Sequence, residues 1–138
     1  MITLPFRVPF RVRYSEIDYQ AIAYNAHYLT WMDITIHEFF KAVPYDYPAK
    51  RAETGGDFHT VKATIEFKQP LRLDEDFAGE LRIGRIGRSS LTFDVRLVVE
   101  GEGAPRATGE IIWVYADQAS GRSAALPDEL LERLPASS

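Results

Sequence analysis

Cysteine is absent from the 138-residue chain. This absence excludes disulfide bonds, thiolate metal sites and cysteine nucleophiles. No apolar run approaches the roughly 20 residues that a membrane-spanning helix requires. The first five residues also lack the basic and apolar regions of a secretory signal. We therefore expect a cytoplasmic protein without membrane insertion.

Histidine is scarce, and the chain has no excess of positive charge. The three histidines, His27, His37 and His59, lie 10 and 22 residues apart, and this spacing has none of the paired ligands of a zinc site, so no metal is predicted. The formal net charge of -4 argues against nonspecific nucleic-acid binding, which needs an excess of cationic groups. A small polyanionic ligand remains compatible, because a few clustered arginines can hold phosphates on an acidic protein.

The composition is that of a folded soluble protein, with 46% hydrophobic and 26% charged residues. A chain of this length can bury one core but is too short for two ordinary domains. We expect a single domain that spans residues 1–138.

Alternation of apolar and polar residues predicts five strands. They cover residues 6–14, 61–67, 77–86, 91–99 and 107–117. Pro9 cannot donate a ladder hydrogen bond, which favours an edge position for the first strand. Residues 111–115 are apolar on both faces, which places the last strand near the sheet centre or at an interface.

One long amphipathic helix is predicted between the first and second strands. Leu29, Met32, Ile36, Phe40 and Val43 recur every three or four residues. The helix should begin near Asn25, a favoured N-cap residue, and end before Pro44, with a loop over residues 44–56 and a short second helix over 128–134. One helix hardly covers five strands, so the remaining apolar surface predicts a homodimer or a higher oligomer.

The connection over residues 13–28 is dense in carboxylates, aromatic rings and hydrogen-bonding groups. Catalytic groups are often displayed on such connections between rigid elements. The start of the long helix would present free backbone N–H groups and partial positive charge to the same region. These groups can stabilise an oxyanion while a carboxylate activates water or attacks directly.

Residues 12–18 and 24–33 resemble the signature of the 4-hydroxybenzoyl-CoA thioesterase family of hotdog proteins. Residues 87–93 and 117–134 resemble later parts of that family and give supporting likeness. The resemblance implies an α+β hotdog fold, in which a five-stranded antiparallel sheet wraps one long helix and a short helix closes the chain.

The same resemblance implies hydrolysis of an acyl-CoA thioester to a free acid and CoA, with no metal or organic cofactor. Asp18 matches the catalytic carboxylate, as nucleophile or general base, and the backbone N–H near Tyr24 matches the oxyanion donor, with Asn25 beside it. The implied assembly is a homodimer or homotetramer whose active site lies at a subunit interface. The implied substrate-binding residues are His27, Lys62, Arg88, Ser89 and Ser90.

Three positions depart from the family pattern. Ala21 stands where a glycine is usual, Asn25 where many members carry a histidine, and His27 where an asparagine is common. Two alternatives therefore stay open: a hotdog hydratase acting on enoyl or hydroxyacyl thioesters, and a protein that binds acyl thioesters without turnover. Glu16 has two interpretations, because it either lies beside Asp18 or forms a structural ion pair with Arg13 or Arg11.

Overall fold

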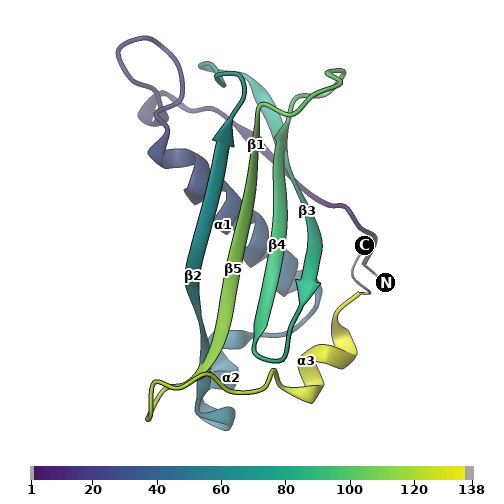
Figure 1. The fold of residues 1–138 in the computed structure, drawn as a ribbon. Helices are drawn as coiled ribbons and strands as arrows, with labels where there is room; N and C mark the ends of the chain where they lie inside the picture. Colours follow the sequence, from purple (N-terminus) through teal and green to yellow (C-terminus); the bar gives the residue numbers. More distant parts are fainter. Residues whose placement is uncertain (1, 136–138) are drawn as a thin grey trace.

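A computed structural model describes residues 2–135 of the chain. Five strands form one antiparallel sheet in the order β1-β3-β4-β5-β2, and a long helix, α1 (Ala26–Ala42), crosses one face of it (Figure 1). The strands are β1 (Phe6–Arg11), β2 (Gly56–Phe67), β3 (Asp76–Ile86), β4 (Ser90–Val98) and β5 (Ala107–Asp117). The predicted α+β class, the five strands and the long helix are confirmed, but the first strand ends at Arg11 instead of residue 14, and the second begins at Gly56 instead of residue 61.

The apolar stripe of α1 packs directly on the sheet. Met32, Ile36 and Phe39 are fully buried, as the helical period predicts. Two strand glycines permit this close approach, because a Cβ at Gly79 would overlap the hydroxyl of Thr35 and a Cβ at Gly109 would overlap the sulfur of Met32. The helix therefore lies closest to the sheet at Gly79 and Gly109, which have no side chain.

The two edges of the sheet differ in exposure. β1 forms one edge and contains Pro9, in agreement with the prediction. β2 forms the other edge, and its central residues, 59–64, are exposed on both faces. Val61 in the middle of β2 is 59% exposed and lies at a register shift against β5. An apolar side chain thus stands in the open at the centre of an edge strand.

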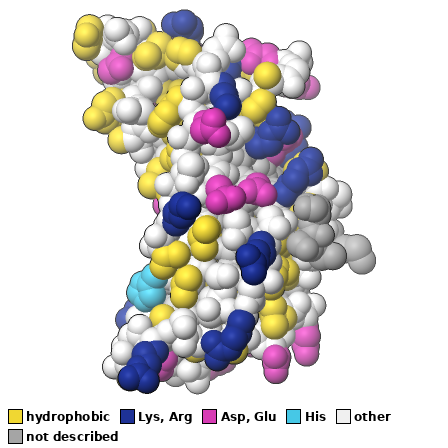
Figure 2. Space-filling view, in the orientation of Figure 1, with side chains coloured by type: hydrophobic (Ala, Val, Ile, Leu, Met, Phe, Trp, Pro, Cys, Tyr) yellow, Lys and Arg dark blue, Asp and Glu magenta, His cyan; other side chains and the backbone are white. Residues whose placement is uncertain are grey.

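The sheet face turned away from α1 carries interspersed basic and acidic side chains (Figure 2). Asp94 and Glu110 lie directly opposite each other there, on β4 and β5. Burial, and secondarily the charge of Glu110, raises the pKa of Asp94. This face is therefore charged, whereas the opposite face holds the apolar core.

The predicted loop over residues 44–56 is wrong, because the structure contains a second helix, α2 (Tyr47–Thr54). Asp46 caps it by accepting a hydrogen bond from the Ala49 amide at 3.1 Å, Pro48 occupies its first turn, and Gly55 ends it at φ 73°. All three features are ordinary signals of helix boundaries. None of its residues is buried, so the helix has no apolar stripe that a period search could detect.

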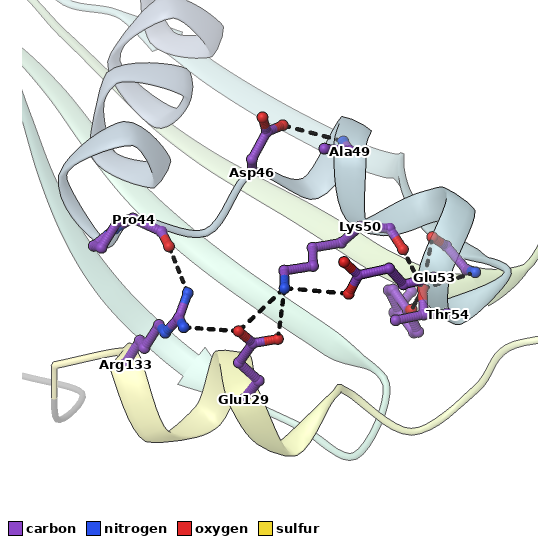
Figure 3. Close-up of polar contacts among 10 residues, drawn as sticks. Pro44, Asp46, Ala49, Lys50, Glu53, Thr54, Glu129 and Arg133 are labelled. Carbon is purple, nitrogen blue, oxygen red and sulfur yellow. Dashed lines mark hydrogen bonds and ion pairs between the residues drawn. The ribbon is translucent and has the colours of Figure 1, made fainter.

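Polar contacts tie α2 to the last helix, α3 (Asp128–Arg133) (Figure 3). Lys50 Nζ lies 3.0 Å from a Glu129 carboxylate oxygen, and Arg133 lies 2.7 Å from the other one. Arg133 also donates to the Pro44 carbonyl at 2.6 Å. The short C-terminal helix is thus present, one residue shorter than predicted, and is joined to the end of α1.

An aromatic cluster fills the core at the α2 end of the sheet. Phe40 stacks on Trp113 with a centroid separation of 5.4 Å and an interplanar angle of 3°. Tyr47, Phe58 and Phe93 contact the same indole at 5.4 to 5.6 Å.

Within residues 2–135, no helix is both long and apolar enough to span a bilayer.

Candidate active site

Asp18 lies in a tight backbone turn between β1 and α1. Its amide donates to the Ile22 carbonyl at 3.0 Å, and its carbonyl accepts from the Ala21 amide at 3.0 Å. One carboxylate oxygen, Oδ1, accepts the Gln20 amide at 2.8 Å. The other oxygen has no hydrogen bond to any residue that the structure describes, so half of the carboxylate is free for chemistry.

Ala21 adopts a left-handed backbone conformation, with φ 61°. An L-residue with a Cβ is strained there, whereas glycine is not. This conformation explains why a glycine at this position suits the family pattern. The chain keeps the turn with alanine, so the departure at Ala21 does not abolish the local geometry.

A second segment, residues 70–75, holds this turn from the side. The Ala23 amide donates to the Leu71 carbonyl at 2.8 Å, and the Leu73 amide donates to the Ala21 carbonyl at 3.3 Å. The Leu71 amide donates to the hydroxyl of Tyr28, on the first turn of α1, at 3.0 Å. The turn, the segment and the helix start are therefore locked together.

The Asp18 turn, the start of α1 and residues 67–70 border an open cavity of about 370 Å³. Asp18, Tyr24, Asn25 and Tyr28 line one side, and residues 67–70 line the other. Volumes of about 300 to 1,000 Å³ are usual for small-molecule sites. The structure thus brings together the three residues that the sequence marked as catalytic.

The predicted oxyanion donor is a backbone N–H near Tyr24, at the start of α1. The Tyr24 amide is already bonded to the Glu16 carbonyl at 2.9 Å. The amides of Asn25 and Ala26 make no hydrogen bond to any described residue, and these two free donors mark the N-terminus of α1. The free backbone donors near Tyr24 are therefore the amides of Asn25 and Ala26.

The predicted position of Asn25 at the N-cap is confirmed, but its predicted capping hydrogen bond is wrong. Asn25 stands at the N-cap position but already has helical backbone angles, φ −59° and ψ −26°, and its side chain makes no capping hydrogen bond. A capping side chain reaches the amides of the first turn from an extended backbone. Because the backbone of Asn25 is helical and not extended, its side chain does not cap the helix, and Asn25 lines the cavity instead.

Glu16 is a structural carboxylate that supports the turn. It is 6% exposed and accepts the Arg13 amide at 2.8 Å, the Arg13 guanidinium at 3.1 Å and the Trp31 indole N–H at 3.2 Å. Burial raises the pKa of Glu16, but the hydrogen bonds from Arg13 and Trp31 outweigh burial and leave this pKa below its ordinary value. The interpretation as an ion pair with Arg13 is confirmed, and Arg11 pairs with Asp76 instead.

The predicted substrate-binding residues lie apart from the cavity. His27 is half-buried between the rings of Tyr24 and Trp31, at 6.1 and 6.3 Å, and does not line the cavity. Lys62 is exposed in the middle of β2.

Arg88 and Ser89 lie in the turn between β3 and β4, and Ser90 begins β4, at the opposite end of the sheet from the connection between β1 and α1 (Figure 1). Ser90 pairs with Val114 of β5, whereas Phe67 at the cavity pairs with Ala107. Seven residues along β5 correspond to about 23 Å. One chain alone therefore does not bring these hairpin residues to Asp18.

Sequence reasoning missed the wall formed by Gln69 and Pro70, and it missed the buried Arg106 behind that wall. Arg106 donates to the Pro70 carbonyl at 2.6 Å. Gln69 and Pro70 read as an ordinary turn after a strand, and only the sheet order places this turn beside the start of α1.

Within residues 2–135, no cluster of three or more metal-binding side chains occurs.

Known proteins resemble this chain in sequence and in fold. Residues 12–134 match the model of the Thioesterase-like superfamily. The acyl-CoA thioester hydrolase YbgC of Escherichia coli is 28% identical over 131 residues, which cover 95% of this chain and 96% of YbgC.

Two solved structures share the fold. Slr0204, a 1,4-dihydroxy-2-naphthoyl-CoA thioesterase from Synechocystis, superposes with a TM-score of 0.86 at 14% identity and covers 93% of each chain. The protein SAV2348 from Staphylococcus aureus, solved in complex with CoA, gives 0.86 at 20% identity, over 96% of this chain and 83% of that one. With the family match spanning nearly its whole length, the chain belongs to the Thioesterase-like superfamily.

Proposed function

We propose that this protein hydrolyses acyl-CoA thioesters to a free acid and CoA, with Asp18 as the reacting carboxylate. One observation carries the proposal: a carboxylate with a free oxygen lines the same cavity as the N-terminus of α1, where the amides of Asn25 and Ala26 are unbonded. A nucleophile or base and an oxyanion site are the two parts that acyl transfer requires. The name of the relative YbgC supports the same reaction.

The chemistry follows from these two parts. The thioester carbonyl oxygen points at the helix N-terminus, where the amides and the helix dipole stabilise the negative charge of the tetrahedral intermediate. Asp18 either takes a proton from the attacking water or attacks the carbonyl carbon itself. In the second route an acyl-enzyme anhydride forms, and water then hydrolyses it. CoA leaves as the thiolate in both routes.

The CoA part of the substrate is assigned to Arg88, Ser89 and Ser90. Arg88 is exposed and belongs to none of the ion pairs among the described residues, so its charge is free for a phosphate. The CoA complex of the S. aureus protein with the same fold supports a CoA ligand. The hairpin is about 23 Å along β5 from the Asp18 cavity of its own chain, so these residues serve another cavity.

A second copy of the chain supplies that cavity. Antiparallel pairing of two identical β2 edges about a two-fold axis places the start of one β2 beside the end of the other. The Asp18 cavity lies at the end of β2, and the β3–β4 hairpin lies at the end of the sheet where β2 starts. Pairing therefore brings the hairpin end of one subunit toward the Asp18 end of its partner. The exposed β2 edge with Val61 at its centre supports this homodimer.

The reaction is tested by measuring thiol release from short, long and aromatic acyl-CoAs. The wild-type protein should release CoA above background, and Asp18→Asn should lower kcat by about a hundredfold or more, the scale of losing a catalytic acid, base or nucleophile. Asp128→Asn, at an exposed site in α3, is the matched control and should keep the wild-type rate. Unchanged kcat in Asp18→Asn refutes the role of Asp18. A 3-hydroxyacyl product from an enoyl-CoA supports a hydratase instead.

The shared site is tested by mixing two impaired proteins. Asp18→Asn subunits keep the hairpin, and Arg88→Ala subunits keep the carboxylate. After unfolding and refolding together in equal amounts, half of the dimers are mixed and each has one complete site, so activity should recover to about a quarter of wild type. Recovery to no more than the average of the two parent proteins refutes the shared site.

A further inference from the structure

Arg106 is the one arginine that the described chain buries almost completely, with 6% of its surface exposed. It precedes β5, and its amide donates to the Leu97 carbonyl at 2.8 Å. The guanidinium donates to Glu102 through Nε at 2.8 Å and through Nη2 at 2.8 Å. It also donates to Glu75 through Nη1 at 3.0 Å and through Nη2 at 2.9 Å. A planar fork with five donors suits two carboxylates at once, which a lysine cannot match.

The remaining donation goes to the wall of the Asp18 cavity. Nη1 of Arg106 binds the Pro70 carbonyl at 2.6 Å. The Arg106 carbonyl accepts the amides of Lys68 and Gln69 at 2.9 and 3.1 Å. Lys68, Gln69 and Pro70 all line the cavity. One buried residue thus holds three consecutive residues of the wall through its backbone and its side chain.

Glu75 carries the same restraint to the other end of the segment. Its Oε1 accepts the Arg72 amide at 2.8 Å, in addition to Arg106. Its backbone carbonyl accepts the Val12 amide at 3.0 Å. The side-chain hydrogen bond from Arg106 holds the pKa of Glu75 below its usual range, so this carboxylate stays ionised and bonded near neutral pH. One guanidinium therefore holds both ends of the segment over residues 70–75, through Pro70 and Glu75.

The fixed segment in turn holds the Asp18 turn. Ala23 bonds to Leu71, Leu73 bonds to Ala21, and Ile22 forms a bridge with Arg72. Ala21 and Ile22 then bond directly to the backbone of Asp18. Hydrogen bonds therefore link Arg106, through residues 70–75, to the backbone of Asp18.

We propose that Arg106 is a positioning residue for hydrolysis, which clamps residues 68–75 and so orients the Asp18 turn against the start of α1. This inference rests on the proposed function of Asp18. Arg106 touches no reacting atom. Its effect is on the placement of the carboxylate, where a displacement of about 1 Å can cost a hundredfold in rate.

The test compares Arg106→Met and Arg106→Lys with Leu130→Ala. Leu130 is fully buried in α3, which lies at the end of the sheet opposite to the connection between β1 and α1. Leu130→Ala therefore serves as a control for loss of stability alone. All proteins are assayed at a temperature where each is folded by circular dichroism. Hydrogen exchange of residues 18–24 and 68–75 is measured beside kcat and KM. If Arg106→Met does not fold, Glu75→Gln breaks the same clamp with nearly unchanged side-chain shape.

Arg106→Met should lower kcat at least tenfold while KM changes less than threefold, and exchange of residues 18–24 should accelerate. Arg106→Lys should fall between Arg106→Met and wild type, since it keeps the charge but not the fork. Leu130→Ala should leave kcat and the exchange of residues 18–24 as in wild type. A kcat of Arg106→Met within twofold of Leu130→Ala, or unchanged exchange of residues 18–24, overturns the positioning role. Absence of thiol release by the wild-type protein instead refutes the proposed function itself.

Discussion

Replacement of Ala21 by glycine should stabilise the protein. Ala21 has φ 61° and an exposed side chain, so removal of its methyl group forfeits little packing. A left-handed L-residue costs about 1–2 kcal/mol, and glycine avoids this cost. Glycine also gives the unfolded chain more freedom, which lowers stability by about 0.4–1 kcal/mol. The difference favours Ala21→Gly by about 0.5–1 kcal/mol.

Urea and thermal unfolding measure this difference. For a domain of this size the gain should raise Tm by about 2–4 °C. Ala52→Gly is the matched control, because Ala52 is exposed inside α2 with ordinary helical geometry, and it should lose about 0.5–1 kcal/mol. Opposite signs for the same substitution isolate the backbone conformation as the cause. If Ala21→Gly loses as much stability as Ala52→Gly, the left-handed conformation of Ala21 in the Asp18 turn is refuted.

Three further predictions concern the clamp, the edge strand and the helix contact. Arg106 lowers the pKa of Glu75 from its ordinary 4.5, so the stability that this pair contributes is fully present above pH 4.5 and is lost as the pH falls through the lowered pKa of the folded state. The free energy of unfolding of Arg106→Met, measured in urea, should therefore depend less steeply on pH between about 5 and 3 than that of the wild-type protein. In the proposed homodimer, Val61→Asp brings two like charges together across the two-fold axis, so it should give a folded monomer in analytical ultracentrifugation that releases no thiol; an active dimer contradicts the β2 pairing. Gly79→Ala forces a methyl group into Thr35 and should cost about 1–3 kcal/mol in thermal unfolding, whereas an unchanged Tm contradicts the close packing of α1.

β4 and α1 were predictable because each buries one face. Strict alternation in β4 and the apolar stripe of α1 are local patterns that tertiary packing preserves. α2 was not predictable in the same way, because all of its residues remain partly or fully exposed. Its boundary signals were present at Asp46, Pro48 and Gly55, but proline and glycine in the same short stretch also read as a loop.

The candidate site was predictable only in its local part. Asp18, Tyr24 and Asn25 lie within eight residues, so one motif and one helix start bring them together. The choice of free amides depends on a bond between Tyr24 and Glu16 that residue types do not reveal. The wall and its clamp come from residues about 50 and 90 positions further along the chain, where only the sheet order sets proximity.

The two tryptophans of the chain occupy opposite ends of the core. Trp31 is 2% exposed and donates its indole N–H to Glu16, beside the Asp18 turn. Trp113 is 8% exposed and lies in the aromatic cluster beside α2. Each indole is thus a built-in fluorophore for one end of the molecule. Emission from variants that retain a single tryptophan can tell whether the end with the Asp18 turn and the end with α2 unfold together or in sequence.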